Sequence, residues 1–194
     1  MTIAIGGKLW IKGDWDTNPV PAGRIPILIH PNMHVEGAGY NPPTRTLLEL
    51  LERYVQPDSI VLDVGAGSGI LAIAAIKLGA VKAVATDIGA TALATIPINA
   101  RVNAVEDKLL VVDGTFPDAP AASFDLIVSN IGVIPEKQYL GRAGLLLKSR
   151  GMFLFTASLA NLEDYELALF GVGLHRINHV EAGEGMHVFI FQKV

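Results

Sequence analysis

The sequence predicts an α/β fold: a Rossmann-like, mostly parallel sheet of seven strands, with helices on both faces and an antiparallel strand pair at the C-terminus. Two observations predict it. From residue 60 onward, short apolar runs typical of buried strands alternate with longer runs of helical periodicity, and such alternation produces a parallel sheet covered on both sides. At the end of the chain, strands 174–181 and 187–192 follow one another across the short turn 182–185, so they must pair antiparallel.

The expected elements follow a short N-terminal extension. This extension contains two extended stretches, 7–14 and 24–30, a loop over 37–43 and then an amphipathic helix over 44–55. The alternation that follows consists of strand 60–64, helix 70–78, strand 83–86, helix 90–102, strands 109–112 and 126–129, helix 136–147, strand 152–156 and helix 161–170. Pro97 is expected to kink its helix. We divide the chain into an N-terminal arm with a lid loop, residues 1–43, and one compact domain, residues 44–194.

Composition bounds the class of protein. The 194 residues are enough for one domain with a sizeable core. The chain has no cysteine, which excludes disulfides, thiolate metal sites and a cysteine nucleophile. Its net charge of -4 provides no global positive field for nucleic acid. No apolar run near the glycine-rich region approaches the ~20 residues of a membrane span, and residues 1–7 do not resemble a signal peptide. We expect a cytoplasmic protein.

The stretch VLDVGAGSGILAIA, residues 61–74, is a buried strand, a glycine-rich turn and the start of a helix. Glycines at alternate positions let the backbone turn tightly and approach a ligand closely. The dinucleotide-binding pattern G-x-G-x-x-G requires glycine at position 70, where this chain has Ile70. The spacing here is G-x-G-x-G, which resembles the first motif of class I S-adenosylmethionine-dependent methyltransferases. We expect cofactor contacts from Asp63, Gly65, Ala66, Gly67 and Gly69.

Carboxylates follow the next two strands. Asp87 ends the strand in VATDI, where an ionised carboxylate can accept hydrogen bonds from both ribose hydroxyls of a nucleoside. The alternative role for Asp87 is a helix N-cap. Asp113 and Gly114 end the third strand, where we expect the adenine ring, or else a plain Asp-Gly turn. Ile88, beside Asp87, is included in the expected cofactor site.

A closer resemblance covers nearly the whole chain from Lys8 onward. The stretches KLWIKGDWDTNP, IHPNM, NPPTRTLLELL, VLDVGAGSGILAIAAIKLGA, VATDI, NARVN and SNI occur in the order seen in bacterial methyltransferases that modify ribosomal large-subunit protein eleven. This resemblance implies S-adenosyl-L-methionine as methyl donor and S-adenosyl-L-homocysteine as product. It also implies that the cofactor contacts Thr44, Gly65, Asp87 and Asn130.

The chain departs from that family in four ways. The family has an additional N-terminal domain that presents the substrate, whereas this chain starts where the catalytic half begins. The loop HVEGAGYNPPT has Asn41 in the place of a family histidine and adds bulky residues. Pro97 lies where the family has an uninterrupted helix, and GVIP follows SNI. The stretch NPPT resembles a motif of amino-group methyltransferases, but that motif belongs after the fourth strand, where this chain has Asn130.

Methyl transfer from a sulfonium needs neither a protein nucleophile nor a metal; holding the acceptor in line supplies much of the rate. An amine acceptor must first lose its proton. Asn130 is expected to accept a hydrogen bond from the amine, and His34, Glu36 and Tyr40 of the lid loop are candidates for the base, if they are not simply solvated. We expect no metal, because zinc sites need three or four converging ligands.

Several functions remain open at this stage. The main expectation is N-methylation of an amine in a small molecule or peptide, because the chain lacks the substrate-presenting domain and is acidic. The alternatives are lysine or N-terminal methylation of a ribosomal or other protein, and O- or C-methylation in a biosynthetic pathway. A non-catalytic cofactor-binding protein is disfavoured by the intact glycine loop with Asp87, and a nicotinamide enzyme by Ile70. We expect no membrane or nucleic-acid partner, and the oligomeric state stays open.

Overall fold

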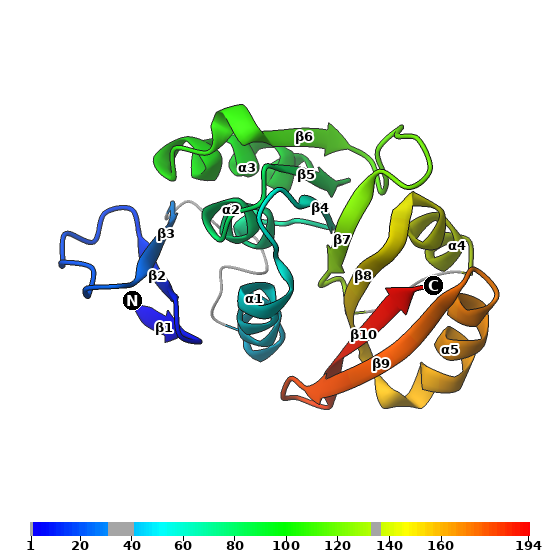
Figure 1. The fold of residues 1–194 in the computed structure, drawn as a ribbon. Helices are drawn as coiled ribbons and strands as arrows, with labels where there is room; N and C mark the ends of the chain where they lie inside the picture. The colour runs from blue at the N-terminus through cyan, green and yellow to red at the C-terminus, as the bar shows by residue number, and fades with distance from the viewer. Residues whose placement is uncertain (1, 31–40, 133–136) are drawn as a thin grey trace.

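The computed structural model describes residues 2–30, 41–132 and 137–194. Its main sheet has seven strands in the order β6-β5-β4-β7-β8-β10-β9 (Figure 1). Strand β10 is antiparallel to both of its neighbours, and the other neighbouring pairs are parallel. This arrangement confirms the predicted fold class. The strands are β4 (Ile60–Val64), β5 (Lys82–Asp87), β6 (Leu109–Asp113), β7 (Phe124–Ser129), β8 (Leu147–Ser158), β9 (Leu174–Glu181) and β10 (Met186–Lys193).

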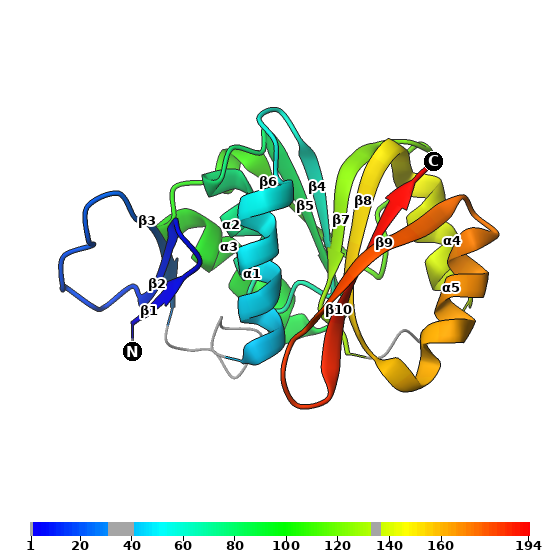
Figure 2. The same ribbon diagram turned by 60° about the horizontal axis from the view of Figure 1, so that its bottom comes forward.

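Helices cover both faces of this sheet (Figure 2). Helices α1 (Pro42–Tyr54), α2 (Ile70–Lys77) and α3 (Ala90–Val102) contribute to one hydrophobic core. Helices α4 (Lys137–Leu146) and α5 (Leu162–Phe170) contribute to a second core on the opposite face. Each strand sends alternate side chains to the two cores, as the pleat requires: Val61 lies in the first and Leu62 in the second. Two 3-10 turns, η1 (Glu106–Lys108) and η2 (Leu159–Asn161), complete the described elements.

Helix α1 starts two residues earlier than the expected start at residue 44 and crosses the expected boundary at residue 43. Asn41 is its N-cap, and the Oδ1 atom of Asn41 accepts a hydrogen bond from the Thr44 amide at 2.9 Å. Pro42 and Pro43 occupy the first turn, where a missing N–H costs nothing. Helix α3 has the expected bounds and is assigned as one helix through Pro97.

The N-terminal arm is a small sheet. It consists of β1 (Ile3–Ile5), β2 (Leu9–Gly13) and β3 (Ile25–Ile29), with β1 antiparallel and β3 parallel to β2. Strands β2 and β3 correspond to the two expected extended stretches, whereas β1 was not expected. Glu52 of α1 accepts hydrogen bonds from the amides of residues 7, 8 and 9 at 2.9 to 3.0 Å. The arm therefore packs as part of the fold.

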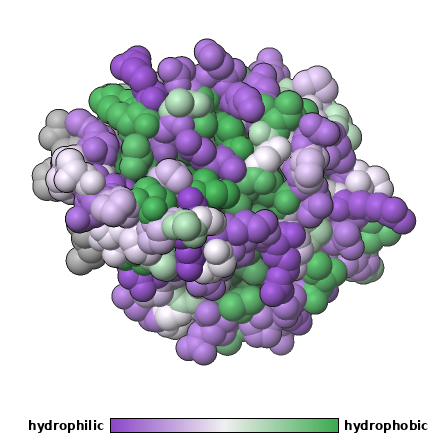
Figure 3. Space-filling view, turned by 60° about the vertical axis from the view of Figure 1, so that its left-hand side comes forward, coloured by the Kyte–Doolittle hydropathy of each residue, from purple (hydrophilic) through white to green (hydrophobic). Residues whose placement is uncertain are grey.

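Figure 3 turns this N-terminal side of the molecule forward; hydrophilic and hydrophobic residues are interspersed on it. The helices within the described ranges 2–30, 41–132 and 137–194 include none that is long and apolar enough to cross a membrane.

Candidate functional site

A cavity of about 780 Å³ opens at the carboxyl ends of the parallel strands. Strands β4 and β7 are neighbours, and the chain continues from β4 to β5 on one side and from β7 to β8 on the other; ligands of open α/β sheets bind at such a point. The volume lies within the range of small-molecule sites. The described residues that line it are Asn41, Pro43, Thr44, Val64, Gly65, Ala66, Gly67, Ile70, Leu71, Asp87, Ile88, Gly89, Thr91, Ala92, Gly114, Thr115, Asn130, Ile131, Gly132, Tyr139 and Met186.

The glycine loop has a backbone that side chains would disturb. Gly65, Gly67 and Gly69 have φ values of +71°, +56° and +77°, which L-residues with a Cβ rarely adopt. A Cβ on Gly65 would lie 2.2 Å from Cγ2 of Ile131, and one on Gly69 would lie 3.0 Å from Cγ2 of Ile96. The loop therefore needs glycine for its backbone angles and, at Gly65, for the close approach of the cavity wall.

Asp87 connects the glycine loop to the start of α3. Its Oδ2 atom accepts a hydrogen bond from the Gly67 amide, and its Oδ1 atom accepts one from the Gly89 amide, each at 2.8 Å. Gly89, and not Asp87, is the N-cap residue of α3. A carboxylate offers about four acceptor positions, so Asp87 keeps acceptor capacity beyond these two amides. It is the one charged side chain among the described residues that line the cavity.

Asp63 lies beneath the loop. It is fully buried, and its Oδ2 atom accepts a hydrogen bond from the Ala72 amide of α2 at 3.0 Å. Its Oδ1 atom has no hydrogen-bond partner among the described residues. Burial raises the pKa of Asp63 to about 7; the nearby Asp87 charge adds to the increase, and the Ala72 amide opposes it. The structure thus places Asp63 behind the cavity wall and not among the described residues that line it.

At the opposite end of the cavity, three side chains form a hydrogen-bonded chain. Nδ2 of Asn130 donates to Oγ1 of Thr44 at 2.8 Å, and Oγ1 of Thr156 donates to Oδ1 of Asn130 at 3.0 Å. The Gly132 amide donates to the same Thr156 hydroxyl at 3.3 Å. Thr44 and Thr156 are buried. The Asn130 amide is therefore held in one orientation by residues of α1 and β8.

Two residues of this region were missed by the sequence analysis. Thr156 is a polar residue near the end of the apolar strand β8, beside β7, and that position was the available signal. Tyr139 of α4 lines the cavity, whereas Thr156 lies behind Asn130, and the Tyr139 hydroxyl donates to Oγ of Ser129 at 2.8 Å. Burial raises the pKa of Tyr139 well above its usual range, so the phenol keeps its proton. Tyr139 looks like any core residue in the sequence.

The other expected site residues divide into three groups. Ala66, Ile88 and Gly114 line the cavity together with Gly65, Gly67, Asp87, Thr44 and Asn130. Asp113 is exposed, and neither it nor Gly69 is among the described lining residues. His34, Glu36 and Tyr40 lie outside the described residues, as does most of the expected lid loop. A search of the described residues for three or more metal-ligating side chains in one place finds no such group.

Comparisons with known proteins identify the family of the chain. The family model described as ribosomal protein L11 methyltransferase (PrmA) matches residues 2–161. The ribosomal protein L11 methyltransferase of Chromobacterium violaceum is 35% identical over 169 residues, 87% of this chain and 54% of the relative. That of Methylobacillus flagellatus is 42% identical over 129 residues, 66% of this chain and 42% of the relative. The chain thus spans about half the length of the curated relatives it matches.

A search of solved structures finds proteins of the same description and the same fold. A structure described as ribosomal protein L11 methylase from Lactobacillus delbrueckii subsp. bulgaricus is 28% identical, with a TM-score of 0.85, and the match covers 100% of this chain and 99% of that chain. A geranyl diphosphate C-methyltransferase from Streptomyces coelicolor, 12% identical with a TM-score of 0.66, shares the fold across 77% of this chain and 78% of that chain. The fold is that of S-adenosylmethionine-dependent methyltransferases, and the chain belongs to the ribosomal protein L11 methyltransferase family.

Proposed function

We propose that this chain is an S-adenosylmethionine-dependent methyltransferase that methylates amino groups of a protein, and that the acceptor is a ribosomal protein of the L11 type. The observation that carries the proposal is the family match over residues 2–161, which includes every described cavity residue except Met186. This favours the protein acceptor over the small amine that the sequence analysis placed first. A ribosomal acceptor also agrees with the expected cytoplasmic location.

The cavity fits a nucleoside cofactor without phosphate groups. Its described lining includes no lysine or arginine to neutralise a pyrophosphate, and its one charged side chain is Asp87. The remaining acceptor positions of Asp87 suit two ribose hydroxyls. Gly65 and Gly67 would allow the backbone to approach the methionyl part, and Ile88 and Gly114 would lie beside the adenine. When bound, S-adenosylmethionine supplies an electrophilic methyl group on a sulfonium.

At the acceptor end, the chain's own residues position an amine and exclude water. Thr156 occupies one acceptor position of the Asn130 Oδ1 atom, and the second remains for an N–H of the acceptor. The neighbouring Ile131 and Met186 side chains are apolar and would keep water away from the reacting atoms. Holding the nitrogen in line with the methyl group would supply much of the rate.

The described wall of the cavity offers no evident general base. Its titratable side chains are Asp87, which is bonded to two amides at the cofactor end, and Tyr139, which keeps its proton. We therefore expect an acceptor lysine, whose ordinary pKa is about 10.4, to react through its small neutral fraction. The rate at saturating donor should rise about tenfold per pH unit between pH 6 and 9. A plateau near neutral pH would instead support a base among His34, Glu36 and Tyr40.

The acceptor is tested with a labelled donor. The full chain is incubated with a purified bacterial ribosomal protein L11 and, in parallel, with a panel of small amines, peptides and phenols. We expect label on amino groups of the ribosomal protein, and none with an Asp87→Ala variant as the matched control. Label confined to small amines or peptides would contradict the protein acceptor, and label confined to phenols would contradict amine methylation altogether.

A further inference from the structure

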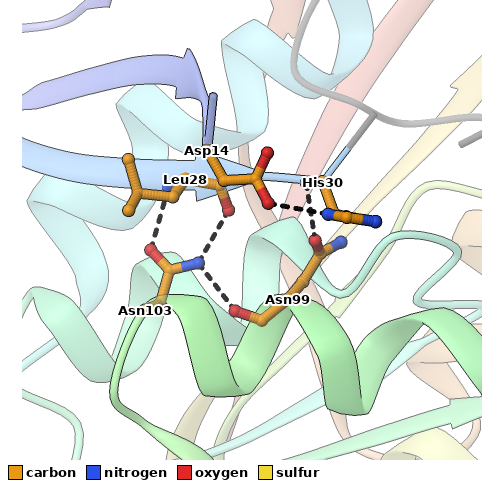
Figure 4. A network of polar contacts seen from close by, with 5 residues as sticks. All are labelled: Asp14, Leu28, His30, Asn99 and Asn103. Atoms are coloured by element: carbon orange, nitrogen blue, oxygen red, sulfur yellow. Dashed lines mark hydrogen bonds and ion pairs between the residues drawn. The ribbon is translucent and has the colours of Figure 1, made fainter. Parts of the chain in front are cut away.

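Two asparagines one turn apart on α3 point toward strand β3 (Figure 4). Asn99 and Asn103 are 0% and 2% exposed. Oδ1 of Asn103 accepts a hydrogen bond from the Leu28 amide at 2.9 Å, and its Nδ2 donates to the Leu28 carbonyl at 2.7 Å. Oδ1 of Asn99 accepts one from the His30 amide, which lies two residues further along the chain and directly after β3, also at 2.9 Å. Together the two side chains pair with β3 much as a neighbouring strand would.

The two asparagines differ in their second contact. Nδ2 of Asn103 donates to the carbonyls of Leu28 and Asn99 and so stays between α3 and β3. Nδ2 of Asn99 donates instead to the carbonyl oxygen of Ser68 at 2.8 Å. Ser68 lies between Gly67 and Gly69, inside the glycine loop. Asn99 is therefore a direct bridge from the N-terminal sheet to the loop that borders the cavity.

The orientation of the Asn99 amide is fixed by its partners. The His30 N–H can only donate and the Ser68 carbonyl can only accept, so the side chain satisfies both in one orientation alone. The end of β3 is itself held in place, because Nδ1 of His30 lies 2.7 Å from Oδ2 of Asp14 and the Asp14 amide donates to the Ile29 carbonyl at 3.1 Å. The His30 amide, which donates to Asn99, is therefore itself held in place.

We propose that Asn99 is a positioning residue for the cofactor, which fixes the Ser68 peptide so that the glycine loop is ordered before the ligand binds. This inference rests on the proposed binding of S-adenosylmethionine or S-adenosylhomocysteine in the cavity. Glycines lose more conformational freedom on ordering than other residues. Asp87 holds the Ala66–Gly67 peptide through the Gly67 amide, and Asn99 holds the Ser68–Gly69 peptide through the Ser68 carbonyl. Without Asn99, binding would have to supply that ordering.

The test compares Asn99→Asp with Asn103→Asp. In both variants the side chain keeps its shape and the acceptor for the β3 amide but loses its N–H donors. We expect the affinity for S-adenosylhomocysteine, measured by calorimetry, to fall about tenfold in Asn99→Asp, as for one lost hydrogen bond. The Asn103→Asp variant should bind within about twofold of wild type, although thermal melting should show both variants destabilised. In the ligand-free protein, amide hydrogens of residues 65–72 should exchange faster in Asn99→Asp alone.

Equal affinity and equal loop exchange in the two variants would overturn the inference. If Asn99→Asp does not fold, Asn99→Ser and Asn103→Ser give the same comparison, because a serine hydroxyl is too short to reach both partners. With saturating acceptor and varied donor, Asn99→Asp should raise KM for S-adenosylmethionine and keep kcat, which a general loss of folded protein would not do. A wild-type chain that binds no S-adenosylhomocysteine would contradict the proposed function, and the exchange of the ligand-free loop would still decide the role of Asn99.

Discussion

The two ends of the cavity are held together by different kinds of contact. At the cofactor end the contacts involve the main chain: Asp87 accepts from the Gly67 and Gly89 amides, and the Gly65 and Ala66 amides both donate to the Thr86 carbonyl at 2.9 Å. At the acceptor end the contacts join side chains from distant parts of the sequence. Thr44 of α1, Asn130 after β7 and Thr156 of β8 form one chain there.

We infer from this difference that the main-chain contacts of the cofactor end depend on the fold, whereas the side-chain contacts of the acceptor end depend on the residues of the individual protein. A wall made of main-chain groups tolerates many side-chain changes, and the same fold recurs in a protein 12% identical to this chain. A hydrogen-bonded chain of three side chains changes whenever one of them changes. We therefore expect substitutions at the cofactor end to alter donor affinity and substitutions at the acceptor end to alter turnover.

The largest effect is expected from Asp87→Ala. The substitution removes the carboxylate that we propose accepts hydrogen bonds from two ribose hydroxyls, and hydrogen bonds to charged groups contribute about 1.5 to 3 kcal/mol each. It also frees the Gly67 amide of the glycine loop. The affinity for S-adenosylhomocysteine should fall about a hundredfold, since about 1.4 kcal/mol corresponds to a factor of ten. Titration calorimetry measures it.

Asp87→Asn is the matched control for that prediction. An asparagine keeps one acceptor oxygen and the side-chain shape but loses the charge, so we expect an intermediate loss of about tenfold. The assignment of Asp87 to the ribose is wrong if Asp87→Ala binds S-adenosylhomocysteine as tightly as the wild-type chain does.

Most of the fold could be predicted because it is encoded locally. Helix 90–102 has a continuous helical pattern and was predicted with the bounds that the structure has. Strand β8 was predicted five residues too short at its start: the polar stretch Lys148–Arg150 interrupts the apolar pattern, and its exposed side chains conceal the strand. Strand β1 was missed because three residues are too few for a period-two pattern to emerge.

The site residues, like the strands and helices, could be predicted where a short local motif encodes them. Gly65, Gly67 and Asp87 belong to short motifs at strand ends, and the structure places all three at the cavity. Asp63 belongs to the same motif, yet it points away from the cavity toward α2, because successive residues of a strand face opposite sides. Thr156 and Tyr139 reach the site through tertiary packing, which no local spacing encodes.

A smaller effect, and a different kind of effect, is expected from Thr156→Val. Valine has nearly the shape of threonine but lacks the hydroxyl that fixes Oδ1 of Asn130. The amide can then turn, so the acceptor nitrogen is held less well in line. We expect kcat for protein methylation to fall about tenfold, as for one lost hydrogen bond of about 1.4 kcal/mol. The affinity for S-adenosylhomocysteine should stay within about twofold.

Thr156→Ser keeps the hydroxyl and should restore most of the turnover. The separation of the two cavity ends would have to be abandoned if Thr156→Val weakened S-adenosylhomocysteine binding as much as it slowed methylation.

At Asp63 we expect an effect on stability, which takes the form of a pH dependence. The pKa of Asp63 is about 7 in the folded chain and about 3.9 in an unfolded chain. Between these values the native state binds the proton more tightly than the unfolded state does. The contribution of Asp63 to stability is therefore greatest below pH 4, declines as the pH rises toward 7 and is constant above that.

Asp63→Asn removes this dependence, because an asparagine does not titrate, while its oxygen can still accept from the Ala72 amide. The melting temperature of the variant relative to wild type should rise between pH 5 and pH 8. The nearly two pH units between pH 5 and the folded pKa correspond to a gain of about 3 kcal/mol, or roughly 6–12 °C for a chain of this size. Thermal melting of the ligand-free proteins across this range measures it, and a difference that does not vary with pH would contradict the raised pKa. Because Asp63 lies behind the described cavity wall, we expect a smaller loss of S-adenosylhomocysteine affinity than in Asp87→Ala; an equal loss would place Asp63 in direct contact with the ligand.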